Sequence, residues 1–161
     1  MNVLEELKGA ETVGITGHIR PDGDCIGSCM GLYSYLKDNC PQLDVTVYLE
    51  TPGSEFHYIR DIDKIQTIPD IKKEYDVFFV LDCSSLDRIE PFHSCFENAK
   101  KTVCIDHHIS NGSFADVNVV DAQASSACEV LYRTLEDDKI SKDTAACIYL
   151  SLIHISEPTR H

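Results

Sequence analysis

The sequence predicts an α/β fold in which helices cover both faces of a parallel sheet. Short apolar runs that suit buried strands alternate along the chain with segments that suit helices. This alternation is typical of a parallel sheet built by right-handed crossovers. The run Val77–Leu81 is entirely apolar, as expected of a central strand that is covered on both faces. A chain of 161 residues, 43% of them hydrophobic, is long enough for one domain with a core.

The expected strands are short, apolar, rich in β-branched or aromatic residues and bounded by turn residues. They cover residues 12–17, 44–49, 76–81 and 102–105, and residues 117–120 form a shorter candidate.

The expected helices place apolar residues three and four positions apart, the spacing of a helix with one buried face. The clearest helix begins at Asp24 and continues to about Lys37. Ser125 or Ser126 is expected to cap another, which ends near Glu136. The other expected helices cover residues 2–8, 86–98 and 141–150, with a short one near 55–61 in the otherwise looped stretch 51–70.

The net charge of −13 narrows the classes of partner. A surface this acidic argues against binding long nucleic acid, which requires a basic surface. It does not argue against a small phosphorylated substrate, because some of the acids can be metal ligands whose charge the ions offset.

The cysteine pattern and the lack of long apolar runs indicate the compartment. The eight cysteines include no Cys-x-x-Cys pair, and several lie inside apolar runs, where a free thiol behaves as a small hydrophobe. No apolar run approaches the roughly 18 residues of a membrane-spanning helix, and the first residues form an acidic amphipathic segment, not a secretory signal. We therefore expect a cytoplasmic protein with no membrane partner.

Metal-ligand side chains follow the first expected strand. His18, Asp22 and Asp24 lie in the turn that leads into the next helix, whose N-terminus favours anions such as phosphate. Gly27 and Ser28 are expected to let the backbone of that helix approach a ligand. The alternative is a capped turn, in which Asp22 or Asp24 is the N-cap and His18 is a surface residue.

Two further strands end in side chains of the same type. Asp82 follows the third strand, and Asp106, His107 and His108 follow the fourth. Alone, an acid at the end of a strand is more often a turn residue than a ligand. The carboxyl ends of parallel strands meet at the edge of the sheet where ligands bind, and imidazole and carboxylate donors together suit divalent ions such as Mn²⁺. We therefore expect the three clusters to form one metal site.

The three motifs resemble those of the DHH phosphoesterase family. The resemblance covers residues 1 to about 153 and rests on Gly17–Ser28, Val80–Asp82 and Ile105–His108. Within the family the chain is most similar to bacterial bifunctional nanoRNases (oligoribonucleases) that also act as phosphatases of 3′-phosphoadenosine 5′-phosphate (pAp).

This resemblance implies two bound Mn²⁺ ions, with Mg²⁺ or Co²⁺ as alternatives. His18, Asp22 and Asp82 would hold one ion. Asp24, Asp82 and His107 would hold the other, so that Asp82 bridges the pair.

The remaining site residues would act on the substrate. By the same resemblance, Asp106 would orient the neighbouring histidines, and His108 would contact the scissile phosphate or assist the leaving oxygen. Arg20 and Arg88 are candidate phosphate contacts, with solvated surface charges as the alternative.

The end of the chain departs from the family pattern. The family's fourth motif has an Asp ligand where this chain has Ile155, and its glycine-rich second domain has no counterpart here. We expect a DHH domain over residues 1–150, a missing C-terminal domain, and a tail at 151–161 that is foreign to the family. A natural short C-terminus is the alternative.

The expected function is hydrolysis of short oligoribonucleotides and pAp by hydroxide formed between two metal ions. Cyclic dinucleotides and inorganic pyrophosphate are alternative substrates within the same superfamily. A metal-binding module without turnover is the alternative from another class. A homodimer is a candidate assembly, but the sequence does not determine the oligomeric state.

Overall fold

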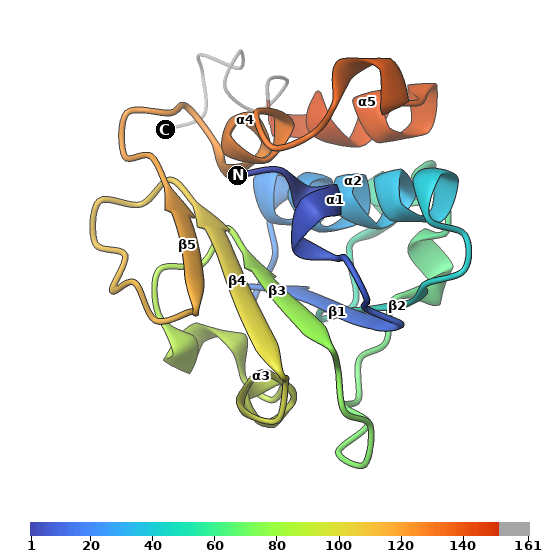
Figure 1. Cartoon of the computed structure of the whole chain (residues 1–161). Helices are drawn as coiled ribbons and strands as arrows, with labels where there is room; N and C mark the ends of the chain where they lie inside the picture. Colours follow the sequence, from blue (N-terminus) through green and yellow to red (C-terminus); the bar gives the residue numbers. More distant parts are fainter. Residues whose placement is uncertain (152–161) are drawn as a thin grey trace.

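Five parallel strands form the centre of the computed structural model, which describes residues 1–151 (Figure 1). They are β1 (Thr12–Gly17), β2 (Asp44–Tyr48), β3 (Val77–Leu81), β4 (Lys101–Asp106) and β5 (Val117–Val120). Their order across the sheet is β2-β1-β3-β4-β5, and every neighbouring pair is parallel. The expected parallel sheet is confirmed, with strand bounds within one residue of those expected from the sequence.

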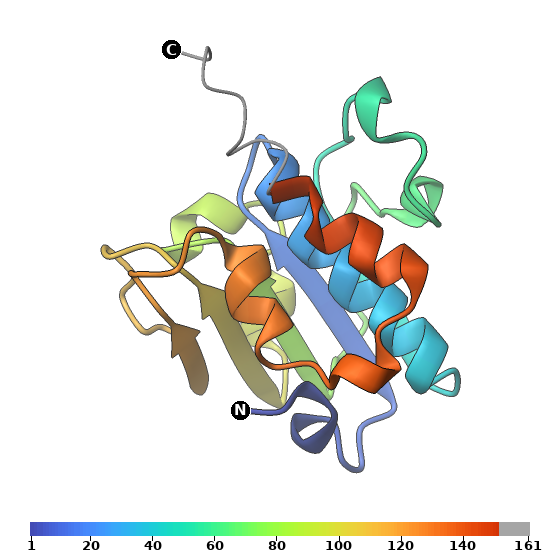
Figure 2. The same ribbon diagram turned by 90° about the horizontal axis from the view of Figure 1, so that it is seen from above.

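Helices cover both faces of this sheet, as expected (Figures 1 and 2). One face carries α1 (Val3–Glu6), α2 (Gly23–Asn39), α4 (Ala127–Tyr132) and α5 (Lys142–Ile148), and the other carries α3 (His93–Glu97). Among the helices of residues 1–151, none combines the length and the apolar character needed to cross a membrane.

The central strand β3 packs against both helical layers. Val77, Phe79 and Leu81 belong to the core on the α2 side. Phe78 and Val80 belong to an aromatic cluster on the α3 side. Alternate side chains of a strand point to opposite faces, so the uninterrupted apolar run correctly indicated a strand with no solvated face.

The helix expected over residues 86–98 is divided into two pieces. A 3₁₀ turn covers Leu86–Ile89, and α3 starts only at His93. Pro91 lies between them, and Glu90 has an extended backbone with ψ of 139°. A residue before proline is disfavoured in the helical region, and proline itself donates no backbone hydrogen bond. The continuous helix was therefore a wrong expectation.

The short α-helix expected near residues 55–61 is also absent. Two 3₁₀ turns, Ser54–Phe56 and Ile62–Lys64, take its place. Asp61 between them has a left-handed backbone with φ of 60°, which no residue inside an α-helix adopts.

Helix α4 begins as expected but ends early. The Ser126 side chain accepts a hydrogen bond from the Glu129 N–H at 3.1 Å, so Ser126 is the N-cap. The helix ends at Tyr132 and does not reach Glu136, whose N–H donates to the Tyr35 hydroxyl of α2. The Glu136 N–H is thereby bonded to α2 and not to a carbonyl of α4.

Helices α2 and α5 pack closely at Gly27. A Cβ atom added there would lie 2.4 Å from the Cys147 carbonyl oxygen of α5. One turn later, a Cβ at Gly31 would lie 3.4 Å from the Cys147 Cβ, an ordinary contact. The expectation that Gly27 lets a ligand approach was wrong, because α5 occupies that space. Ser28 is also fully buried, and its hydroxyl donates to the Cys25 carbonyl within α2.

We predict opposite effects for alanine at these two glycines. Gly27→Ala forces α2 and α5 apart and is expected to cost about 1–3 kcal/mol of unfolding free energy. Gly31→Ala, the matched control, has room for the methyl group and gains up to about 1 kcal/mol from helix propensity. Urea denaturation followed by circular dichroism measures both. Equal stability of the two variants would contradict the close packing at Gly27.

Candidate metal centre

Three neighbouring strands deliver polar side chains to one edge of the sheet. His18 follows β1, Asp82 follows β3, and Asp106 ends β4. This edge lies at a point where the strand order changes direction, because β1 connects to β2 on one side and borders β3 on the other. A cavity of about 410 Å³ opens there. Its lining includes His18, Asp22, Asp24, Asp82, His107 and His108.

Asp82 lies at the centre of this group. Its side chain is almost fully buried, and its two oxygens face two different histidines. Oδ2 lies 3.4 Å from His18 Nε2, and Oδ1 lies 3.4 Å from His107 Nε2. The backbone of Asp82 is left-handed, with φ of 55°. This conformation costs on the order of 1–3 kcal/mol in a non-glycine residue, so the surrounding structure must hold it in place.

Each histidine also has a second carboxylate beside it. His18 Nε2 lies 3.6 Å from Asp22 Oδ1, and His107 Nε2 lies 3.4 Å from Asp24 Oδ2. These separations exceed the roughly 2.7–3.2 Å of a hydrogen bond. They are close to the spacing of neighbouring ligands that each lie about 2.0–2.2 Å from one ion. The geometry therefore gives two groups that share Asp82, which we call half-sites. One contains His18 and Asp22, and the other contains His107 and Asp24.

The charges of the group are strongly coupled. Burial of His18 lowers its pKa, but the carboxylates of Asp22 and Asp82 outweigh burial and raise the pKa to about 11. The Asp82 carboxylate beside it raises the pKa of His107. Burial and the charge of Asp82 raise the pKa of Asp24. The group thus concentrates negative charge that only protons on the imidazoles or a bound cation can balance, and its donor set fits divalent ions.

Asp22 and Asp24 are each held by the start of a helix. Asp22 Oδ1 accepts the Cys25 N–H at 3.0 Å and is the N-cap of α2. Asp24 accepts the N–H groups of Ala127 and Cys128, at 2.9 and 3.0 Å, in the first turn of α4. The capped-turn alternative is therefore correct that Asp22 is an N-cap, but wrong that His18 is a surface residue, because His18 is half-buried and lines the cavity. The N-cap role is compatible with a metal site, because both acids still line the cavity.

Asp106 contacts the His108 ring on the side away from the cavity. Its Nδ1 lies 2.6 Å from Asp106 Oδ1, and its Nε2 lies 4.0 Å from Asp82 Oδ1 at the cavity. Asp106 is fully buried, and its other oxygen accepts from Asn111 Nδ2 at 2.9 Å. Sequence reasoning missed Asn111. The available signal was a carboxamide three residues after a His–His pair, in a stretch without strand or helix periodicity.

Sequence reasoning also missed the Cys25 thiol. Its Sγ forms a group with donor atoms of His18 and Asp82 in which all three lie within 4.8 Å of one another. Cys25 is fully buried, and burial raises the pKa of the thiol well above its usual value. The signal was its position directly after Asp24.

The two candidate arginines have different positions. Arg88 lines the cavity, and its carbonyl oxygen accepts the Ile19 N–H at 2.7 Å, which ties the turn after β1 to the segment after β3. Arg20 is exposed, is not among the cavity-lining residues, and donates its backbone N–H to the Glu50 carboxylate. The structure therefore brings Arg88, and not Arg20, to the metal centre.

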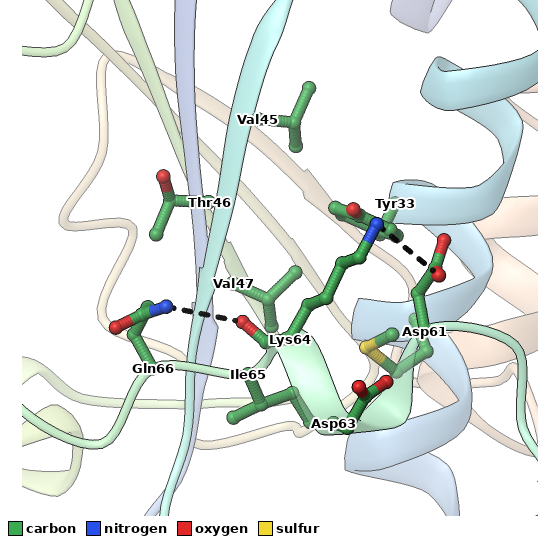
Figure 3. A pocket seen from close by; sticks show the side chains of 10 residues that line it. Tyr33, Val45, Thr46, Val47, Asp61, Asp63, Lys64, Ile65 and Gln66 are labelled. Atoms are coloured by element: carbon green, nitrogen blue, oxygen red, sulfur yellow. Dashed lines mark hydrogen bonds and ion pairs between the residues drawn. The ribbon is translucent and has the colours of Figure 1, made fainter.

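A second hollow of about 400 Å³ lies elsewhere, between α2, β2 and the stretch 61–66 (Figure 3). The Lys64 side chain extends along it toward Asp61, whose Oδ1 lies 3.5 Å from the Lys64 Nζ. Its lining includes no histidine, cysteine or expected site residue, and this hollow is separate from the metal centre.

Comparison with known proteins identifies the family. The model of the DHH family, N-terminal domain, matches residues 12–152. The chain belongs to the DHH family. Ile155, at the expected fourth-motif position, lies outside the described residues.

Individual proteins resemble this DHH domain over part of their length. The probable bifunctional oligoribonuclease and PAP phosphatase NrnA of Streptococcus mutans is 28% identical over 94% of this chain and 47% of its own length. The corresponding protein of Bacillus subtilis is 24% identical over 89% of this chain and 45% of its own length. The chain thus spans about half the length of these curated relatives.

A solved structure has a similar fold. An exopolyphosphatase-related protein from Bacteroides fragilis matches with a TM-score of 0.81 and 26% identity, over 94% of this chain and 48% of its own. The fold of the DHH domain is therefore shared with a protein about twice as long.

We predict that Asp82→Ala abolishes metal binding at both half-sites of the DHH domain, because the Asp82 carboxylate belongs to both. Isothermal titration with Mn²⁺ measures the stoichiometry. Asp76→Ala is the matched control, since Asp76 precedes β3 at the opposite edge and accepts the N–H groups of Glu11 and Thr12. Near-normal stoichiometry in Asp82→Ala would rule out the shared role of Asp82.

Proposed function

We propose that the chain is a metal-dependent phosphoesterase domain that hydrolyses short oligoribonucleotides and pAp with two Mn²⁺ ions. The observation that carries this proposal is the position of Asp82, shared between two histidines that each have a further carboxylate beside them. Membership of the DHH family and the names of the two NrnA relatives support the substrate class.

The two half-sites define which residues would hold the ions. His18, Asp22 and Asp82 would hold one, and Asp24, Asp82 and His107 the other. Mg²⁺ or Co²⁺ are alternatives to Mn²⁺, because carboxylates and imidazoles accept several divalent ions. When bound, such a pair supplies a nucleophile at neutral pH and neutralises the charge of a phosphate ester.

The other cavity residues act on the substrate. Asp106 holds the Nδ1 side of His108, so that His108 presents Nε2 to the cavity. With the Nδ1 proton directed to Asp106, Nε2 is the nitrogen that can take up a second proton and pass it to a phosphoryl oxygen or to the leaving oxygen. Arg88 offers a guanidinium, which pairs well with phosphate oxygens. A cavity of about 410 Å³ on a chain of net charge −13 suits a small nucleotide and not a long duplex.

A second substrate class has a specific observation in its favour. The exopolyphosphatase-related protein from Bacteroides fragilis shares the fold at 26% identity. Its name favours an inorganic phosphoanhydride, such as pyrophosphate, as the alternative substrate for the same metal centre. Cyclic dinucleotides are the third candidate.

The thiols support a reducing compartment, and we propose the cytoplasm. All eight cysteines are free, and seven of them are buried. Disulfides form readily in oxidising compartments, whereas thiols packed into a core are typical of proteins kept reduced.

The proposal is tested directly with the purified chain. It is incubated with Mn²⁺ and, separately, with pAp, a diribonucleotide, pyrophosphate and a cyclic dinucleotide, and the products are separated by chromatography. We expect inorganic phosphate from pAp and mononucleotides from the dinucleotide. Metal binding without any product would instead describe this polypeptide as a binding module, and release of phosphate from pyrophosphate alone would favour the phosphoanhydride class.

We further predict that His108→Ala separates turnover from metal binding. The loss of one acid–base group is expected to lower the turnover number by about 10²–10⁴-fold, while Mn²⁺ stoichiometry stays unchanged. His93→Ala is the matched control, because His93 lies on α3 between Glu90 and Glu97 and away from the cavity. Loss of metal in His108→Ala would mean that His108 and His107 have exchanged roles.

A further inference from the structure

Asn111 lies in the loop between β4 and β5, three residues after His108. Its side-chain Nδ2 reaches Asp106 Oδ2 at 2.9 Å and the Cys83 carbonyl oxygen at 3.4 Å. Its Oδ1 accepts the Ser113 N–H at 2.8 Å. Both ends of the carboxamide are therefore engaged, and its orientation follows from these partners, because only the nitrogen end can donate.

The Asp106 carboxylate needs these donors. It is fully buried, and a buried carboxylate without hydrogen-bond donors is strongly destabilising. Asn111 occupies Oδ2 and leaves Oδ1 for His108 Nδ1 at 2.6 Å. Without the Asn111 contact, the carboxylate is free to rotate about its last bond and present either oxygen to the ring.

Asn111 also links two strand ends. Cys83, whose carbonyl it reaches, directly follows Asp82. The next residue, Gly112, donates its N–H to the Ser84 carbonyl at 3.2 Å. The loop that carries Asn111 is thus hydrogen-bonded to the segment after β3. The segment that carries Asp82 therefore also helps to position His108.

We propose that Asn111 is a positioning residue that fixes the Asp106 carboxylate, and through it holds His108 with Nδ1 protonated and Nε2 facing the cavity. This inference rests on the proposed function for its effect on turnover, but its structural content concerns only the metal-free chain. Substitution of a residue that hydrogen-bonds to a metal ligand or active-site residue commonly lowers metal affinity or activity by about 10–100-fold.

The chain offers a matched control for Asn111. Asn118 is half-buried like Asn111 and binds the Ala115 backbone, with Nδ2 donating to the carbonyl at 2.7 Å and Oδ1 accepting the N–H at 3.2 Å. It stabilises the same connection between β4 and β5, but it does not contact Asp106. Asn118→Ala therefore measures the effect on His108 of losing a side-chain amide that stabilises this loop but does not bind Asp106.

The first experiment uses nuclear magnetic resonance of the ring nitrogens in the metal-free chain. In the wild type and in Asn118→Ala we expect a single His108 state with a protected Nδ1 proton. In Asn111→Ala we expect that proton to exchange faster with water and the Nε2–H tautomer to appear. An unchanged His108 ring in Asn111→Ala would overturn the proposal, whatever substrate the chain hydrolyses.

If Asn111→Ala does not fold, Asn111→Leu replaces it. Leucine is close to asparagine in size and offers no donor to Asp106. The same change in the His108 ring is expected. A His108 ring identical to the wild type in that variant would contradict the role of the Asn111 donor.

The second experiment is kinetic and uses whichever substrate the wild type hydrolyses. Asn111→Ala is expected to lower kcat by about 10–100-fold, with KM and Mn²⁺ stoichiometry within about twofold of the wild type. In a His108→Ala background the same substitution should have no further effect, because Asn111 acts through His108. An equal additional loss in that background would show that Asn111 acts by another route.

Discussion

The site depends on one buried carboxylate shared between two imidazoles. Asp82 is almost completely removed from solvent, and burial of its charge is costly unless charged or hydrogen-bonding partners offset it. His18 and His107 provide those partners and lower the pKa of the Asp82 carboxyl despite burial. Asp82 has a left-handed backbone, and its N–H donates to the Ile105 carbonyl of β4 at 3.0 Å, which holds the residue against the neighbouring strand.

The strand order explains why these groups meet. Adjacent strands of a sheet lie about 4.8 Å apart, so side chains at the ends of β1, β3 and β4 fall within reach of one another. Gly27 allows α5 to approach α2, and α4 packs beside them and binds Asp24. The candidate metal centre is therefore formed by the sheet edge together with the helical layer above it.

The sequence predicted those parts that depend on local pattern. The apolar run of β3 located a central strand, and the polar residues after it and its neighbours located the cavity. The sequence could not show that Arg88 and not Arg20 lines the cavity. Both are arginines in turns after a strand, and only the three-dimensional fold decides which of the two turns faces the cavity. The partners of Asp24 lie more than 100 residues away in the chain, and such contacts have no signature in local periodicity. The break at Pro91, by contrast, has a local signature, because a proline inside a helical pattern ends the helix.

The helix starts that hold Asp22 and Asp24 give the acids two functions at once. Each carboxylate satisfies backbone N–H groups that a helix end leaves without partners, and each faces the cavity beside a histidine. Burial and the like charge of Asp82 raise the pKa of Asp24, and the N–H donors of α4 act against that rise. Helix α4 thus stabilises an arrangement of negative charges that would otherwise separate.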